Sequence, residues 1–151
     1  MPQDSPVPDA VADHWTELLD DARATAAEYR DRGWDVLLVH TADATVVEEG
    51  LDVLVPDNEY DELTALAAQT DFDNSRVFAT TAGGVRFLLI VVEATEAKQA
   101  VAVPAYFAVA EEPTLREQGT TAGLLTTQLR ALGSESQVTF THDDPSIFFS
   151  E

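Results

Sequence analysis

The segment 85–93, which reads VRFLLIVVE, is the strongest strand-forming stretch in the chain. The pair Gly83-Gly84 precedes it, and glycines supply the positive φ angles that a tight hairpin turn requires. A second apolar segment at 99–109 follows the short stretch 94–98, so we expect it to return antiparallel to 85–93. With a further strand at 76–80, the pattern predicts a meander of three antiparallel strands.

Two features predict the places of individual strands. Pro104 lies inside the segment 99–109, and proline cannot donate a backbone hydrogen bond, so we expect a bulge or an edge position there. The strand at 34–40 is apolar on both faces, which is typical of a central strand. Shorter strands are predicted at 45–48, 51–55, 137–141 and 146–150.

Three segments show the apolar spacing of three and four residues that is typical of helices. The first covers 9–32, and the second covers 57–69. The third is predicted from Thr114 to Leu132, because Thr114 and Glu117 have the spacing of a capping box. Its predicted buried stripe consists of Leu125, Leu129 and Leu132, and Gly133 is expected to end it. In the first helix the acidic residues are predicted to face solvent; they are Asp13, Glu17, Asp20, Asp21, Glu28 and Asp31.

These elements follow one another in the order αβββαβββαββ, with hairpins dominating. Such an order predicts an α+β fold in which about three helices pack on a mostly antiparallel sheet. The length of 151 residues suits one domain. We expect residues 1–8, which include three prolines, to form a disordered lead-in, and residues 9–151 to form the domain.

Composition excludes several classes of protein. The chain has no cysteine, which excludes disulfides, thiolate nucleophiles and cysteine-ligated zinc. No apolar run approaches the ~20 residues that span a bilayer, and residues 1–9 lack the pattern of a signal peptide. We therefore expect a cytoplasmic protein without a membrane partner.

Acidic residues outnumber basic ones by 28 to 8, which gives a formal net charge of -20. They are spread over the whole chain, so a disordered acidic tail does not explain them. Three interpretations remain open: adaptation to molar salt, mimicry of nucleic acid, and ordinary acidity. Adaptation to salt is favoured, because ~1 M salt shortens the Debye length to about 3 Å and screens the repulsion. The dispersed acidic residues do not follow the spacing of phosphates, which disfavours mimicry of nucleic acid. The sequence also lacks a basic patch of the kind that binds nucleic acid.

The composition of the chain resembles that of proteins from halophilic archaea that accumulate salt. Only one lysine is present, and alanine, valine, threonine and acidic residues are abundant. The stretches EYRDRGW at 28–34 and DVLLVH at 35–40 further resemble a small uncharacterised haloarchaeal family. That resemblance implies no known activity.

Asp57, Glu96 and Lys98 are the first candidates for catalysis. The pair Pro56-Asp57, followed by Glu96-Ala97-Lys98, is similar to the PD-(D/E)xK nuclease pattern. In that pattern two carboxylates hold a divalent cation and a lysine assists the attacking water. Here, however, Glu96 and Lys98 fall in a predicted turn rather than a core strand. The alternative is that Asp57 caps a helix and that Glu96 and Lys98 are solvated.

His40, His142, Asp143 and Asp144 are the candidates for a metal site. Imidazoles and carboxylates are common ligands of zinc and manganese, and these four residues would form a site if the strand ending at His40 neighboured the C-terminal hairpin. The alternative is that 142–145 is an exposed turn and His40 a strand end.

The C-terminal segment Ile147-Phe148-Phe149 is the candidate for interaction with another protein. It either completes the core, which is the default for such side chains, or docks a partner or a second copy by strand addition.

No phosphate-binding loop, nucleophile elbow or zinc-protease motif is present in the sequence. We therefore expect a non-enzymatic module, without a cofactor, that binds a protein or a small ligand. The alternative is a metal-dependent hydrolase or nuclease that uses Asp57, Glu96 and Lys98, or His40 and His142.

Overall fold

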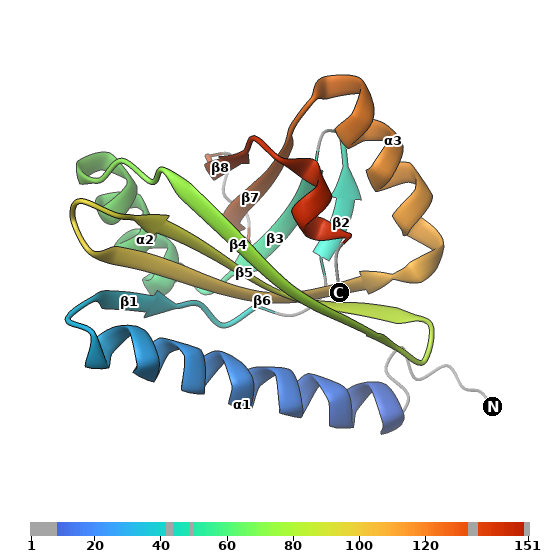
Figure 1. The fold of residues 1–151 in the computed structure, drawn as a ribbon, viewed down its shortest axis with the longest axis horizontal. Coiled ribbons are helices and arrows are strands. Elements are labelled where there is room, and N and C mark those ends of the chain that lie inside the picture. Colours follow the sequence, from blue (N-terminus) through green and yellow to red (C-terminus); the bar gives the residue numbers. More distant parts are fainter. Residues whose placement is uncertain (1–8, 42–43, 49, 133–135, 150–151) are drawn as a thin grey trace.

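The computed structural model describes residues 9–41, 44–48, 50–132 and 136–149 (Figure 1). The predicted lead-in at 1–8 lies outside these ranges. The described residues form a single α+β domain with the predicted order αβββαβββαββ. Its helices are α1 (Asp9–Asp31), α2 (Asp57–Gln69) and α3 (Glu112–Ala122); its strands are β1 (Asp35–Leu38), β2 (Ala44–Val47), β3 (Gly50–Val55), β4 (Asn74–Ala82), β5 (Val85–Ala94), β6 (Gln99–Ala108), β7 (Leu125–Ala131) and β8 (Val138–His142).

The strands form two four-stranded sheets where the sequence predicted one. The first sheet has the order β1-β6-β5-β4. Strands β4, β5 and β6 form the predicted antiparallel meander, and β1 joins β6 in parallel. Gly83 and Gly84 make the β4–β5 turn with φ angles of 60° and 77°, a conformation that glycine adopts readily.

The second sheet has the order β2-β3-β7-β8. Strands β3 and β7 pair in parallel at its centre, and β2 and β8 are antiparallel to them. A side chain at Gly50 would overlap with β7, because a Cβ atom there would lie 1.9 Å from the carbonyl oxygen of Thr126. Only glycine therefore allows this approach of the two strands.

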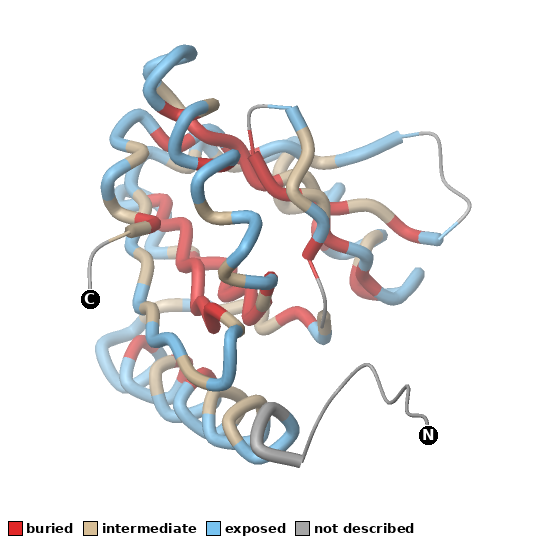
Figure 2. The backbone as a smooth tube through the Cα atoms, turned by 90° about the vertical axis from the view of Figure 1, so that its right-hand side faces the viewer, coloured by how far each residue is buried: buried red, intermediate tan, exposed pale blue. Residues whose placement is uncertain are grey.

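The main core lies between the two sheets, where buried side chains of β3, β5, β6 and β7 meet. Figure 2 shows this buried layer along the central strands. Helix α1 covers the other face of the first sheet through Ala22, Ala26 and Tyr29. The acidic residues of its opposite face are all exposed, as predicted; they are Asp13, Glu17, Asp20, Asp21, Glu28 and Asp31.

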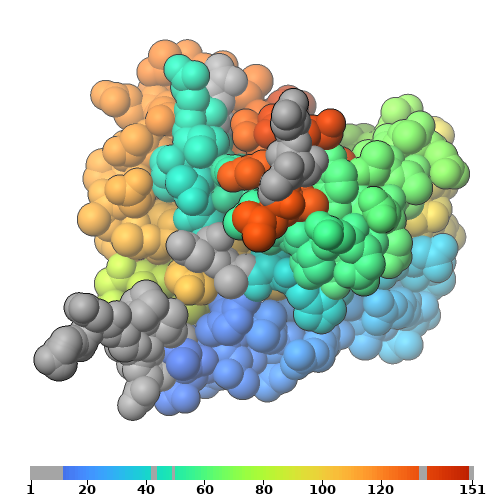
Figure 3. Space-filling model, turned by 180° about the vertical axis from the view of Figure 1, so that it is seen from behind, coloured from blue at the N-terminus to red at the C-terminus, as the bar shows by residue number. Residues whose placement is uncertain are grey.

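Helices α2 and α3 contact the second sheet, α2 at β7 and β8 and α3 at β3 and β7. They lie on opposite sides of the face seen from behind (Figure 3). None of the helices in the described part of the chain has the length and hydropathy of a membrane-spanning segment.

The C-terminal third differs most from the fold that the sequence predicts. The predicted helix from Thr114 to Leu132 ends at Ala122, and the residues after Gly123 form the central strand β7. Gly123 has a φ of 76°, which ends the helix in the left-handed conformation. Leu125 and Leu129 are buried in a sheet instead of a helix stripe, and Leu132 is 81% exposed.

Both ends of the predicted segment also differ. Helix α3 begins at Glu112, so Thr114 lies inside it and makes no capping box. The predicted stop at Gly133 lies outside the described residues. The predicted strand at 146–150 is instead a short 3₁₀ helix at Pro145–Phe148, while the strand at 137–141 corresponds to β8.

One strand placement was also wrong, and one expectation was met in part. Strand β1 lies at an edge of the first sheet rather than at its centre, and its apolar residues are only partly buried. Pro104 makes no bulge, since the β5–β6 register runs without interruption. It does lie beyond Ala102, the last residue that β1 pairs with, so β6 is locally at an edge there. The carbonyl of Pro104 accepts a hydrogen bond from Thr41, beyond the last residue of β1. The backbone nitrogen of Pro104, which carries no hydrogen, faces the same side, where β6 has no partner strand and needs no hydrogen bond.

Candidate functional site

A groove of about 370 Å³ runs between α1 and β4. Phe87 and Leu89 of β5, both buried, form its apolar floor. On the β4 side Phe78 is 52% exposed, although it lies directly beside the buried Leu89 in the neighbouring strand. The other residues that line it are Leu18, Asp21, Ala24, Thr25, Glu28, Ala79 and Thr80.

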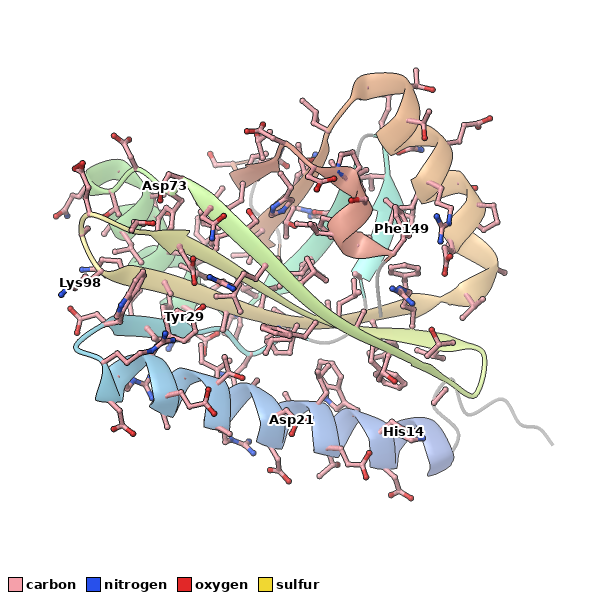
Figure 4. All side chains as sticks on the ribbon, viewed as in Figure 1. His14, Asp21, Tyr29, Asp73, Lys98 and Phe149 are labelled. Carbon is pink, nitrogen blue, oxygen red and sulfur yellow. The ribbon has the colours of Figure 1, made fainter. Side chains whose placement is uncertain are left out.

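The groove has carboxylates on one wall only. Asp21 and Glu28 are seven residues apart on α1, so both project from the same face of the helix. Figure 4 marks Asp21 in the middle of α1. Both side chains are exposed, and neither makes an ion pair with another described residue. The groove therefore presents an apolar floor beside two carboxylates that lack a counter-ion from the described chain.

A buried polar cluster lies between the C-terminal part of α1 and the first sheet. Glu93 of β5, only 6% exposed, accepts hydrogen bonds from the hydroxyl of Tyr29, from Asn74 at 2.7 Å and from Arg76 at 3.1 Å. Trp34 packs edge-on against Tyr29, with ring centroids 5.4 Å apart. The donors to Glu93 come from two elements, α1 and β4, and hold both against β5.

The pKa values of this cluster reflect its hydrogen bonds. Burial alone would raise the pKa of Glu93, but the bonds from Tyr29 and Asn74, with the charge of Arg76, outweigh it and hold that pKa below its usual range. Burial raises the pKa of Tyr29 to about 12, and the Glu93 carboxylate acts in the same direction. Glu93 is therefore an ionised carboxylate whose acceptor oxygens are occupied, which is typical of a structural group.

A second buried cluster joins the two sheets at His142. Nδ1 lies 2.7 Å from Oγ of Ser75 in β4, and Nε2 lies 2.8 Å from Oγ1 of Thr127 in β7. The ring also packs edge-on against Phe148 at 5.1 Å. Hydroxyl groups can donate or accept, so both nitrogens of a neutral imidazole are satisfied in either tautomer. Burial lowers the pKa of His142 to about 4, although the nearby charge of Asp143 acts in the opposite direction.

His142 and His40 are in different environments. His40 follows β1 and is bound through its backbone N–H and its ring to the carboxylate of Glu59, a buried residue of α2. Asp143 and Asp144 line a polar pocket of about 350 Å³ together with Ser75. Asp144 accepts hydrogen bonds from the backbone and hydroxyl of Ser146, which caps the 3₁₀ helix.

Among the described residues, the predicted metal candidates thus separate into two locations that share no hydrogen-bonding partner. Within the residues that the structure describes, no three His, Asp or Glu side chains are grouped so that they could hold a metal ion.

Asp57, Glu96 and Lys98 are not brought together. Asp57 is the first residue of α2, following Pro56 at the N-cap, and makes no cap itself. Glu96 lines a pocket with Gln69, at the other end of that 13-residue helix. A rise of 1.5 Å per residue places the two ends about 18 Å apart. Glu96 and Lys98 are exposed in the β5–β6 turn, as the solvated interpretation predicted, and Figure 4 shows Lys98 at the tip of this turn.

The C-terminal candidates are folded onto the protein. Phe148 is fully buried in the main core, and Ile147 and Phe149 are partly buried against it. The guanidinium of Arg116 lies 4.4 Å from the centre of the Phe149 ring. The structure therefore places Phe148 in the core.

One family model matches residues 5–150 of the chain, and its description is a family of unknown function, DUF7529. The chain belongs to this family. No curated protein and no solved structure matches it. Membership of DUF7529 assigns no activity.

No pattern in the sequence predicted the groove. One part of it could have been predicted. Successive side chains of a strand point to opposite faces of the sheet, so if Val77 and Ala79 face the core, the apolar side chain of Phe78 lies on the opposite face. Asp21 and Glu28 were recognised only as residues of a solvated helix face. The Tyr29–Glu93 contact joins residues 64 positions apart, and no local pattern indicates it.

Proposed function

We propose that this protein is a non-enzymatic binding module and that the groove between α1 and β4 binds a small amphipathic cation. The observation that carries this proposal is the half-exposed Phe78 beside an apolar floor, in a groove that the carboxylates of Asp21 and Glu28 also line. The volume of about 370 Å³ is within the range of small-ligand pockets, which are mostly apolar with a few convergent polar groups.

The charge of the groove selects the ligand class. An apolar body on Phe78 and Leu89 would bring an ammonium or guanidinium group close to Asp21 or Glu28. An aromatic ring such as Phe78 also attracts a cation placed over its face. An anionic ligand would be repelled by the same carboxylates and by the net charge of -20.

The proposal is tested with a matched pair of probes. We expect phenethylammonium to shift the backbone amide NMR signals of Leu18, Phe78 and Leu89, and the neutral 2-phenylethanol to bind more weakly. The titration is run at the lowest salt concentration at which the protein stays folded, because salt screens the charges. Equal affinity for the two probes, or shifts confined to another surface, would contradict the proposal.

Charge-neutral variants locate the cation. The double variant Asp21→Asn/Glu28→Gln should weaken binding of phenethylammonium about ten-fold, since exposed charges contribute up to about 1 kcal/mol each. The matched control is Asp13→Asn/Asp31→Asn, which removes the same charge from the same helix outside the groove. An equal loss in both double variants would indicate a general effect of charge and not a site.

We also propose that the acidic surface is an adaptation of a cytoplasmic protein to molar salt. The exposed acidic face of α1 supports this proposal, because its carboxylates lie where salt can screen them. On this basis the protein should lose its cooperative fold when it is transferred from about 2 M KCl to dilute buffer, as followed by circular dichroism. An unfolding transition that is unchanged by the transfer would refute the proposal.

A further inference from the structure

Strand β4 forms the longest outer strand of either sheet. It has nine residues and ends the order β1-β6-β5-β4, whereas the other outer strands, β1, β2 and β8, have four or five. Among the described residues, no strand pairs with its outer edge. Figure 1 shows β4 crossing the front of the molecule.

The sequence of β4 carries little of the usual protection of a sheet edge, although the 3₁₀ helix at Pro145–Phe148 contacts this strand. Soluble proteins place prolines, unpaired charges or short strands at such edges to prevent pairing with another chain. The segment 74–82 reads NSRVFATTA and contains no proline and no acidic residue, although 28 acidic residues are spread over the chain. Its one charge, on Arg76, is directed to Glu93 of the neighbouring strand.

The register of the hairpin shows which backbone groups face outward. Ala82 and Val85 flank the two-residue turn and form a hydrogen-bonded pair. Because the direction alternates along a strand, Phe78 and Thr80 also bond to β5, while Val77 and Ala79 direct their N–H and C=O groups to the outer side. On that side no hydrogen bond joins the backbone of Val77 or Ala79 to another described residue.

We propose that a second copy of this chain pairs with β4 in antiparallel orientation, centred on Phe78, and forms a two-fold symmetric dimer. In this register Val77 of each copy is hydrogen-bonded to Ala79 of the other. The two Phe78 residues form a non-hydrogen-bonded pair, in which Cα atoms are about 4.5 Å apart and side chains are in contact. Aromatic pairs across strands are stabilising, and no like charges lie opposite each other, since Arg76 faces Thr80.

The charge of the protein is compatible with pairing at this edge. Two copies that each carry a charge of -20 repel each other wherever carboxylates meet. Strand β4 offers an edge with no carboxylate, and its exposed Phe78 is apolar. Repulsion between the remaining surfaces is screened in molar salt, so we expect the dimer there and a monomer at the lowest salt concentration at which the protein stays folded. A single strand pair is a small interface, which indicates a weak, concentration-dependent dimer.

Cysteine cross-linking tests the register, because the chain contains no cysteine of its own. In about 1 M KCl under mild oxidation, the variant Phe78→Cys should form a disulfide-linked dimer, since the paired Cα atoms lie within disulfide range. The matched control is Thr80→Cys, on the same face of the same strand. In the proposed register its two copies are offset by four residues, or about 13 Å, and cannot be bridged. Cross-linking at least about ten times faster for Phe78→Cys supports the proposal. Equal rates in the two folded variants, or no cross-link in either, would overturn it.

A second measurement requires no cross-link. Sedimentation of the unmodified chain in molar KCl should give twice the mass of 16.4 kDa as concentration rises. Ala79→Pro should remain a monomer, because proline removes an outward N–H that β5 does not use; Ala79→Ser, which keeps it, should dimerise. A dimer that persists in a folded Ala79→Pro variant, or an unmodified chain that stays monomeric, refutes the pairing. The proposed pairing uses the backbone of β4 and not the carboxylates of α1. The double variant Asp21→Asn/Glu28→Gln should therefore weaken ligand binding and leave the dimer intact.

Discussion

Replacement of Phe148 by alanine is expected to lower the free energy of unfolding by about 3–5 kcal/mol, the range found for buried phenylalanines. The side chain is fully buried between the two sheets and contacts the ring of His142. Its removal leaves a cavity beside β4 and β8, which the surrounding strands cannot fill. Chemical denaturation followed by circular dichroism measures the loss. Leu132→Ala is the matched control: this leucine is 81% exposed, so we expect a change within about 0.5 kcal/mol.

Deletion of residues 145–151 should have a larger effect than the point substitution. Arg86 is 2% exposed and donates two hydrogen bonds to the carbonyl oxygen of Phe148, at 3.1 and 2.9 Å. Without that acceptor a buried guanidinium loses its partners on this side, which is strongly destabilising. Pro145 also covers Gly119 of α3. We expect no cooperative unfolding transition in the truncated chain. A truncated chain that folds but no longer associates would instead support a docking role for Ile147 and Phe149.

Acidification from pH 7 to pH 4 is expected to destabilise the protein through His142. Its pKa is lowered to about 4 in the folded protein, whereas an unfolded histidine titrates near 6.5. The unfolded state therefore binds a proton first, and stability falls as the pH drops from about 6.5 to about 4. Below the folded pKa both states are protonated and this contribution stays constant. The difference in pKa corresponds to about 3 kcal/mol in total.

The contribution of His142 is isolated by comparison with a variant. His142→Gln keeps a hydrogen-bonding side chain between Ser75 and Thr127 but cannot titrate, so its stability should depend less on pH between 6.5 and 4. Glu93 also stabilises the folded protein, because its folded pKa lies below the usual range. This contribution disappears only as the pH falls through that lowered pKa. Identical pH profiles of the variant and the unmodified protein would show that His142 does not cause the loss.

Local patterns in the sequence predicted the elements that local rules determine. Helix α1 and the β4–β5–β6 meander follow from apolar spacing and from the glycine pair in the turn. The strand β7 was missed because LLTTQLRAL has leucines at both helical and alternating spacing. The two threonines in it favour a strand, and Gly123 before it favours a helix end, but the helical spacing outweighed both in the prediction.

Features that depend on distant contacts could not be predicted. The division into two sheets follows from the parallel pairs β1–β6 and β3–β7, and a single sequence carries no local signal for either. The same holds for the site. Glu59, Glu93 and His142 are polar residues whose burial depends on partners far away in the chain, while Asp57 and Glu96 have suggestive neighbours in sequence but lie apart in space.

The order of the strands has a consequence for synthesis of the chain. Every strand of the first sheet lies before residue 109, so this sheet and α1 can assemble while the C-terminal part is still being made. The second sheet cannot, because β3 has to wait for β7, and the pairing of Gly50 with Thr126 closes a loop of about half the chain. During that interval the inner face of the first sheet lacks its cover. We expect the nascent chain to be most prone to aggregation then, and the repulsion between its many carboxylates to counteract this.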